Sequence, residues 1–253
     1  MTNNFYSQFE QDRIINTLLN NKKNGFFVDI GAYDGITFSN SFFFEKQNNW
    51  SGICFEPNPI SFKKLSQVRN CILINGGISD KEGSLTFKAF SGNQELEMLS
   101  GFQEFFNENQ KLRIEEELIN VKNSQTETVQ IQTHSLNKVL KDNNVNCVDY
   151  CSIDTEGGEY NILKTIDFDS IYISTLSVED NFDSKEVIKY LDSKGFIFLF
   201  LWKCDLFFIN KNEKISFFTK IKLVKYYLNY HLKNTGILYI VFKRFYKSVL
   251  KKS

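Results

Sequence analysis

The sequence predicts an α/β fold with a mostly parallel, seven-stranded sheet, a reversed edge hairpin and a helical C-terminal extension. Three observations lead to this prediction. Short apolar runs alternate with segments of helical periodicity along the 253 residues, which is typical of layered helices and strands. The apolar run 27–30 enters a glycine turn, and the run 52–55 ends in an acid. The runs 195–202 and 206–209 are separated by three residues, and so short a link requires an antiparallel pair.

The first half of the chain gives each element its own signal. Apolar residues fall on one face of a helix over 8–21. Pro57 and Pro59 are the only prolines, and they stand where a strand must stop and a helix must start. We therefore expect strands over 26–30, 52–56 and 71–75, with helices over 38–47 and 59–68.

The second half continues the alternation. Strands are expected over 83–90, 129–132, 148–153 and 174–178, and helices over 136–141, directly after Gly157 and over 184–193. The segment 94–122 is acidic and helix-compatible. We interpret it as an insertion at the position of a substrate lid, although a plain surface excursion explains it equally well.

The segment 27–35 (FVDIGAYDG) is the most informative part of the chain. Gly31 allows a sharp turn, and we expect its backbone to approach a ligand that a Cβ would keep away. Asp29 and Asp34 would repel the diphosphate of a dinucleotide. They suit a ligand that carries an amine or sulfonium cation, such as S-adenosylmethionine. A strand–turn–helix without any ligand remains the alternative.

Glu56 ends the second predicted strand, in the segment 50–59 (WSGICFEPNP). An acid roughly 20 residues after a glycine turn is placed to bind ribose hydroxyls in nucleotide-binding α/β folds. A carboxylate accepts hydrogen bonds from both hydroxyls at once. The alternative is a surface glutamate before a turn.

Together these segments resemble the FkbM family of S-adenosylmethionine-dependent methyltransferases. The resemblance covers about residues 6–210 and rests on YSQF at 6–9, the glycine turn, SNSFFFE at 39–45, the segment around Glu56, NGGISD at 75–80 and IDTEGGEY at 153–160. It implies the Rossmann-like class I methyltransferase fold. Two departures stand out: the family usually has a glycine at or beside Glu10, and the tail beyond Lys211 has no counterpart.

The resemblance and the chemistry together indicate where the cofactor binds. Asp29 and Gly31 are expected at the methionine end and Glu56 at the ribose, with Ser79 and Asp80 at the adenine amine. The N-terminal residues around Gln8 either close over the pocket or simply pack the first helix. The predicted cofactor-binding residues are Gln8, Asp29, Gly31, Tyr33, Asp34, Ser39, Glu56, Pro57, Ser79 and Asp80.

Acids also end the fourth and fifth predicted strands, where open α/β sheets bind ligands. The predicted catalytic residues are Asp154, Glu156 and Glu179. One of them, with a pKa raised by burial and like charges, would be the general base for an acceptor hydroxyl. Alternatively, Asp154, Glu179 and Asp180 hold Mg²⁺ or Mn²⁺, which lowers the pKa of the hydroxyl. A third possibility is that these acids only cap helices.

Neither histidine belongs to a motif of the family. His134 lies between a predicted strand and a helical turn, and His231 lies in the basic tail. Cys147 and Cys151 lack the second pair of ligands that a zinc site needs.

Composition suggests one enzyme domain over 1–212 and a basic, aromatic extension over 213–253. Residues 214–253 contain ten Lys or Arg and no Asp or Glu. This extension is explained either by an amphipathic helix on an anionic membrane or polyanionic partner, or by a helical cap on the domain. It has no run of roughly 18 apolar residues that would span a bilayer, and no RNA-recognition motif accompanies it. The odd number of cysteines and the lack of a signal peptide favour a reducing cytoplasm, with a peripheral position at the inner membrane face left open.

We therefore expect an S-adenosylmethionine-dependent O-methyltransferase. The resemblance implies a sugar hydroxyl as acceptor, on a nucleotide-linked sugar or a surface polysaccharide. The alternatives are another small hydroxylated metabolite or RNA as acceptor, or a cofactor-binding interaction module without catalysis.

Overall fold

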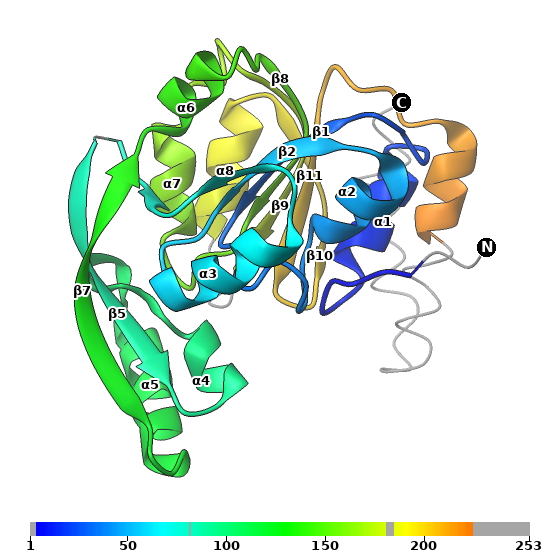
Figure 1. Cartoon of the computed structure of the whole chain (residues 1–253). Coiled ribbons are helices and arrows are strands. Elements are labelled where there is room, and N and C mark those ends of the chain that lie inside the picture. The colour runs from blue at the N-terminus through cyan, green and yellow to red at the C-terminus, as the bar shows by residue number, and fades with distance from the viewer. Residues whose placement is uncertain (1–3, 81, 181–184, 225–253) are drawn as a thin grey trace, which may run out of the picture.

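The computed structural model describes residues 4–80, 82–180 and 185–224. Its main sheet has seven strands in the order β10-β11-β9-β8-β1-β2-β3 (Figure 1). The strands are β1 (Phe26–Ile30), β2 (Ser51–Phe55), β3 (Ile72–Ile74), β8 (Cys147–Ile153), β9 (Tyr172–Glu179), β10 (Phe196–Trp202) and β11 (Asp205–Asn210). All pairings are parallel except those of β11, which runs antiparallel to both β9 and β10. The predicted fold class is confirmed, with the reversed strand inside the sheet and its hairpin partner β10 at the edge.

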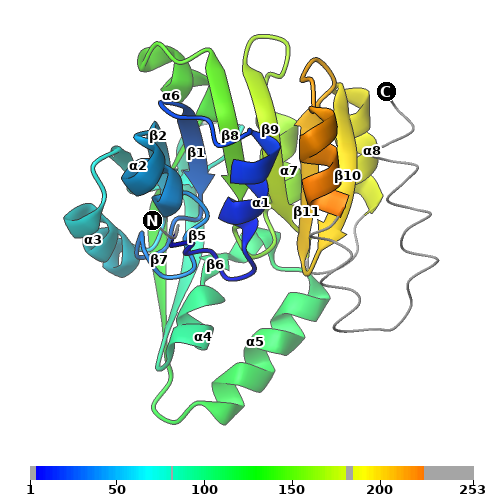
Figure 2. The same ribbon diagram turned by 90° about the vertical axis from the view of Figure 1, so that its right-hand side faces the viewer.

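Helices cover both faces of this sheet (Figures 1 and 2). On one face, α1 (Gln11–Leu18), α2 (Phe42–Asn48) and α3 (Pro59–Val68) contribute to a shared apolar cluster with the sheet. On the other, α6 (Leu136–Asp142), α7 (Glu159–Thr165) and α8 (Lys185–Ser193) do the same. The predicted bounds of β1 and α3 are confirmed. The first helix is shorter than predicted because Glu10 and Asn20 take left-handed backbone angles, with φ of 65° and 52°, which a helix does not allow.

Glu10 stands at or beside a position where the family usually has glycine. Its left-handed conformation, φ 65° and ψ 26° at the residue before α1, is one that glycine adopts without steric cost. A glycine at this position would adopt the observed backbone angles more easily than a glutamate does.

Residues between β3 and β8 form a second unit, which the sequence predicted only in part. Its four-stranded sheet has the order β4-β7-β5-β6, with β4 (Gly77–Ile78), β5 (Gly83–Ser91), β6 (Gly101–Phe102) and β7 (Gln125–His134). The segment 94–122 adds α4 (Gln94–Met98), the 3-10 turn η1 (Gln103–Phe105) and α5 (Glu108–Asn120). Leu96 of α4 and Ile114 of α5 belong with Phe90 of β5 to a small separate core.

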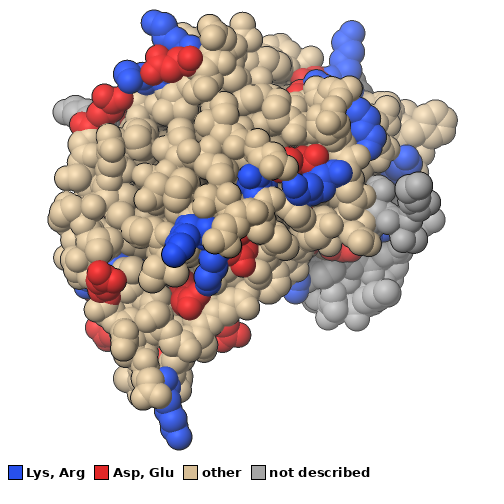
Figure 3. Space-filling model, in the orientation of Figure 1, with Lys and Arg blue, Asp and Glu red and all other residues tan. Residues whose placement is uncertain are grey.

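The C-terminal extension is described only to residue 224. Residues 217–224 are helical, and Leu223 is buried in the cluster that also holds α1. The predicted extension beyond 224, including His231, lies outside the described residues. None of the helices in the described part of the chain has the length and apolar character needed to cross a membrane. On the face shown in Figure 3, basic and acidic side chains are interspersed among large uncharged areas.

Candidate active site

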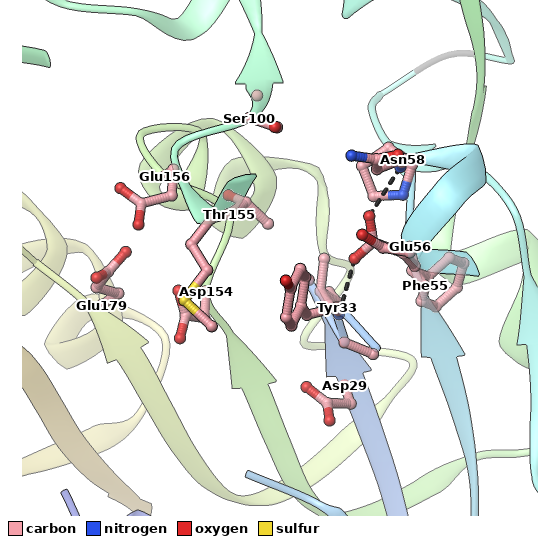
Figure 4. Close-up of a pocket in the computed structure, with 18 of the residues that line it drawn as sticks. Asp29, Tyr33, Phe55, Glu56, Asn58, Ser100, Asp154, Thr155, Glu156 and Glu179 are labelled. Carbon is pink, nitrogen blue, oxygen red and sulfur yellow. Dashed lines mark hydrogen bonds between the residues drawn. The ribbon is translucent and has the colours of Figure 1, made fainter. Parts of the chain in front are cut away.

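A cavity opens at the carboxyl ends of the parallel strands, where β1 and β8 lie side by side. From β1 the chain continues to β2 and β3 on one side, and the strands that follow β8 lie on the other. This is the topological switch point at which open α/β sheets bind ligands. Residues after β1, β2 and β8, the end of β9 and the α4–η1 segment line the cavity, and Figure 4 shows acids approaching it from two sides.

Glycine is needed at position 31 for a steric reason that differs from the one we expected. Its φ is 93°, and a Cβ built on it would lie 1.7 Å from the carbonyl oxygen of Asp154. The glycine is therefore required because the turn after β1 crosses the backbone at the end of β8. The turn also lines the cavity, so it can still approach a ligand, but the ligand is not what excludes a side chain.

Asp29 is held by a buried network beneath the turn. The Ser41 hydroxyl donates to Asp29 Oδ2 at 2.5 Å, and the Arg69 guanidinium donates to Ser41 Oγ at 2.9 Å and to Glu45 at 2.6 Å. Asp29 is 2% exposed and Arg69 4%. Burial raises the pKa of Asp29, and the charge of Arg69 opposes that rise. The network therefore offsets part of the cost of burying this carboxylate at the cavity wall.

Glu56 is oriented by the backbone. Its Oε2 accepts from the Tyr33 N–H at 2.8 Å and its Oε1 from the Asn58 N–H at 2.7 Å, as the dashed lines in Figure 4 show. Burial raises the pKa of Glu56 to about 8 against these two hydrogen bonds. A carboxylate oxygen can accept more than one hydrogen bond, so both oxygens retain capacity for a ligand.

The three predicted catalytic acids meet on the other side of the cavity (Figure 4). Burial raises the pKa of Asp154 to about 6, and it raises that of Glu156 to about 8 with the charge of Asp154 adding to it. Burial and the neighbouring acids also raise the pKa of Glu179. Glu179 Oε2 is buried without a hydrogen-bond partner in the described structure.

Glu159, close by in sequence, has a different environment. Its carboxylate accepts from the backbone N–H groups of Thr155 and Gly157, both at 2.9 Å. It therefore satisfies the turn that leads into α7, as expected of an acid that caps a helix. Asp154, Glu156 and Glu179 make no comparable cap.

The insertion 94–122 forms part of the cavity wall. The Tyr33 hydroxyl donates to Glu97 of α4 at 2.8 Å. Gln110 of α5 donates to the carbonyl of Glu156, and Arg113 lies 3.5 Å from the Glu156 carboxylate. The segment therefore contacts both the turn after β1 and the acidic loop after β8.

The structure places the predicted cofactor residues in two groups. Seven of the ten line the cavity: Gln8, Asp29, Gly31, Tyr33, Ser39, Glu56 and Pro57. Ser79 and Asp80 hydrogen-bond each other and do not line it. Asp34, likewise outside the lining, accepts from the N–H groups of Ile36 and Thr37 within its own turn.

Sequence reasoning missed other residues of the lining. Asn40 belongs to a segment that carried the resemblance, but nothing in the sequence assigned it a role. Met98, Phe102 and Phe105 also line the cavity, and they come from the insertion, where neither spacing nor composition indicates which side chains point inward.

A metal site has no support in the described part of the chain. No group of three or more His, Cys, Asp or Glu is arranged there to hold a metal ion. Asp180, one of the three predicted ligands, does not line the cavity, and neither does His134.

The fold and the position of the cavity define an open α/β ligand-binding protein, and comparison with known families gives the activity. The model of the methyltransferase FkbM domain matches residues 29–198. The chain therefore belongs to the FkbM methyltransferase family. The search of curated proteins found no match.

Two solved structures are similar to the chain. One is the methyltransferase FkbM from Methylobacillus flagellatus KT, with 11% identity and a TM-score of 0.43 over 73% of this chain and 43% of that one. The other is a precorrin-6y C5,15-methyltransferase from Geobacter metallireducens GS-15, with 11% identity and a TM-score of 0.36 over 79% of this chain and 85% of that one. The chain thus spans less than half the length of the first.

Proposed function

We propose that this protein is an S-adenosylmethionine-dependent O-methyltransferase that acts on a sugar hydroxyl. The observation that carries the proposal is the division of one cavity between two sets of carboxylates. Asp29 and Glu56 stand at the ends of β1 and β2, whereas Asp154, Glu156 and Glu179 stand at or beyond the ends of β8 and β9. The first set suits a cofactor and the second an acceptor.

The residues of the first set fit the cofactor. Glu56, fixed by two backbone N–H groups, would accept from the ribose hydroxyls. Asp29 and the turn at Gly31 would face the cationic methionine end. Ile78 and Phe102 line the same cavity and would offer apolar surface to the adenine. When bound, the cofactor supplies a methyl group on a positively charged sulfur.

The second set fits removal of the acceptor proton. With a pKa of about 6, Asp154 is largely ionised at pH 7 and is a stronger base than an unperturbed aspartate. Glu156, with a pKa of about 8, is mostly protonated at that pH and can donate a hydrogen bond to the acceptor. Glu179, whose Oε2 has no partner, can accept one from a neighbouring hydroxyl. We therefore assign the base to Asp154 and acceptor binding to the two glutamates.

The charge of the cavity determines which part of an acceptor molecule can enter it. Among the described residues that line it there are six acids and no Lys, Arg or His. A phosphate group would meet several carboxylates and no cationic side chain among these residues, whereas sugar hydroxyls donate to carboxylates readily. The sugar portion would therefore enter the cavity, and any diphosphate of a nucleotide-linked sugar would lie outside it.

We further propose that the protein works in the cytoplasm, where its five cysteines remain free thiols as they are in the structure. The extension would place it at an anionic membrane surface. Phe217 and Phe218 are 68% and 76% exposed at the start of its helix, and Lys214 and Lys222 beside them are also exposed. Exposed aromatic residues among lysines suit the headgroup region of such a surface. Sedimentation with vesicles of anionic lipid tests this: Phe217→Ser with Phe218→Ser should reduce binding, and equal binding by the variant would refute it.

The function is tested by transfer of labelled methyl from S-adenosylmethionine to nucleotide-linked hexoses and heptoses and to their free sugars, with and without EDTA. We expect label in a base-stable ether linkage to a sugar oxygen. Binding of S-adenosylhomocysteine without transfer to any sugar would move the acceptor to another hydroxylated metabolite, RNA or a polymer. Failure to bind S-adenosylhomocysteine at all would refute the proposed cofactor.

A further inference from the structure

Asn40 lies at the switch point, where it hydrogen-bonds a residue of β8 beside β1. It lies after the turn that follows β1 and two residues before α2 begins. Its Nδ2 donates to the Ser152 hydroxyl on β8 at 3.0 Å. Ser152 is the register partner of Asp29 on β1, so the Asn40 amide lies across the junction of these two strands.

One half of this amide has no partner in the described structure. Asn40 is 6% exposed, and its Oδ1 is buried without a hydrogen bond. The residue lines the cavity. Because a buried carbonyl without a partner is costly, an unpaired amide oxygen on a residue that lines a cavity indicates that a ligand supplies the donor.

The hydrogen bond to Ser152 leaves the other amide atom available. Asn40 Nδ2 donates to the Ser152 hydroxyl, and Oδ1 is the atom without a partner in the described structure. An amide oxygen only accepts hydrogen bonds, so a ligand at this position must bring a donor.

The charges around Asn40 select the donor. Asp29 and Asp154 line the same cavity, and no cationic side chain is among its described lining residues. Arg69 donates to the hydroxyls of Ser39 and Ser41 but lies outside the lining and is paired with Glu45. A ligand carboxylate would be repelled here, whereas an ammonium would be attracted and would bring N–H donors. We propose that Asn40 Oδ1 accepts a hydrogen bond from the α-ammonium group of S-adenosylmethionine. This inference rests on the proposed cofactor and assigns a residue to its amino-acid end.

Two ligands that differ at that end test the inference. S-Adenosylhomocysteine carries the amino-acid group, and 5′-methylthioadenosine has the same adenosine and thioether without it. Titration calorimetry on the full chain should show that Asn40→Leu lowers the affinity for S-adenosylhomocysteine about 10- to 100-fold. The affinity for 5′-methylthioadenosine should change less than about twofold. Asn40→Asp retains an acceptor and should bind S-adenosylhomocysteine as tightly as the wild type or more tightly.

Ser174→Ala is the matched control, because Ser174 Oγ is also buried without a partner but lies outside the cavity lining. It should change neither affinity. Equal weakening of both ligands by Asn40→Leu would show a structural role and overturn the inference, as would a selective loss with Asn40→Asp. If Asn40→Leu does not fold, Asn40→Asp decides alone. A wild-type protein that binds neither ligand would refute the proposed cofactor, an outcome distinct from a change confined to the variants.

Discussion

Glu56→Gln changes one cavity-lining oxygen to an amide nitrogen and should remove most of the affinity for S-adenosylhomocysteine. Both carboxylate oxygens now accept backbone N–H groups, at 2.8 and 2.7 Å. A glutamine side chain has one acceptor, so one N–H would face an NH₂ group and one ribose hydroxyl would lose its acceptor. The lost backbone hydrogen bond is absent from the free and the bound variant alike, so only the ribose hydrogen bond counts toward affinity. With about 1.5–3 kcal/mol for a hydrogen bond to a charged group, its loss weakens binding roughly 10- to 200-fold.

The pKa of this carboxyl gives the prediction a second signature. Burial raises the pKa of Glu56 to about 8 in the ligand-free protein, so about nine tenths of the groups are protonated at pH 7. Ribose hydroxyls donate to the ionised form and favour it. Binding therefore releases about 0.9 proton at pH 7, and affinity should rise as the pH rises towards 8 and level off above it.

Titration calorimetry in phosphate and in Tris buffer measures this release, because the two buffers differ in ionisation enthalpy. We expect the release from the wild-type protein and its loss in Glu56→Gln. Glu116→Gln, which changes an exposed acid on α5, is the control and should behave as the wild type. Wild-type affinity in Glu56→Gln, or an affinity that falls between pH 6 and 8, would refute the assignment of Glu56 to the ribose.

Three further predictions concern catalysis and stability. Asp154→Asn should bind S-adenosylhomocysteine within about threefold of the wild type but lose roughly 10²- to 10⁴-fold in turnover, as for a general base; undiminished transfer would contradict the role. Gly31→Ala places a Cβ 1.7 Å from the Asp154 carbonyl oxygen at φ 93° and should destabilise the protein by more than about 3 kcal/mol, so an unchanged thermal midpoint would argue against the geometry of the turn. Glu56 and Glu156 both have a folded-state pKa of about 8, which lies above their unfolded value, so the folded state binds more protons than the unfolded state between about pH 5 and 8. The free energy of unfolding should therefore fall as the pH rises through that window. A stability that rises there, measured by thermal unfolding without ligand, would contradict the burial of these acids.

Elements whose signal is local were predictable from the sequence. The bounds of β1 and α3 follow from an apolar run and from prolines at a strand end, and the structure agrees with both. The antiparallel β10–β11 pair follows from a three-residue link in the sequence. Because parallel strands present their carboxyl ends at one edge, the convergence of Asp29, Glu56 and Asp154 could also be inferred.

Features that depend on distant partners were not predictable. The strand expected over 129–132 runs from Gln125 to His134, since its polar first half pairs with β5 and carries no apolar alternation of its own. The steric need for Gly31 arises from Asp154, more than a hundred residues away. Ser79 and Asp80 follow β4, a two-residue strand that turns the chain into the second sheet, and that turn leaves them outside the cavity lining.

The two sides of the cavity differ in how far their acids are already satisfied. Glu56 has both oxygens engaged by rigid backbone donors, which suits an acid that must hold a ligand in one orientation. Glu179 has a buried oxygen without a partner in the described structure, and the pKa of Asp154 near 6 permits exchange of a proton near neutral pH. Under the proposed function, the β1–β2 side would hold the cofactor in one orientation and the β8–β9 side would take the acceptor proton.

The insertion links these two sides. Glu97 of α4 holds Tyr33, whose own N–H orients Glu56, while Gln110 and Arg113 of α5 contact Glu156. A displacement of α4 and α5 would therefore disturb cofactor binding and acceptor binding together. The two helices contact the wall residues Tyr33 and Glu156, while Leu96 of α4 and Ile114 of α5 pack in a cluster with Phe90 of β5. Under the proposed function, the insertion would shape the acceptor pocket without contributing to the core of the main sheet. Acceptor specificity should then follow the sequence of 94–122 more closely than that of the strands.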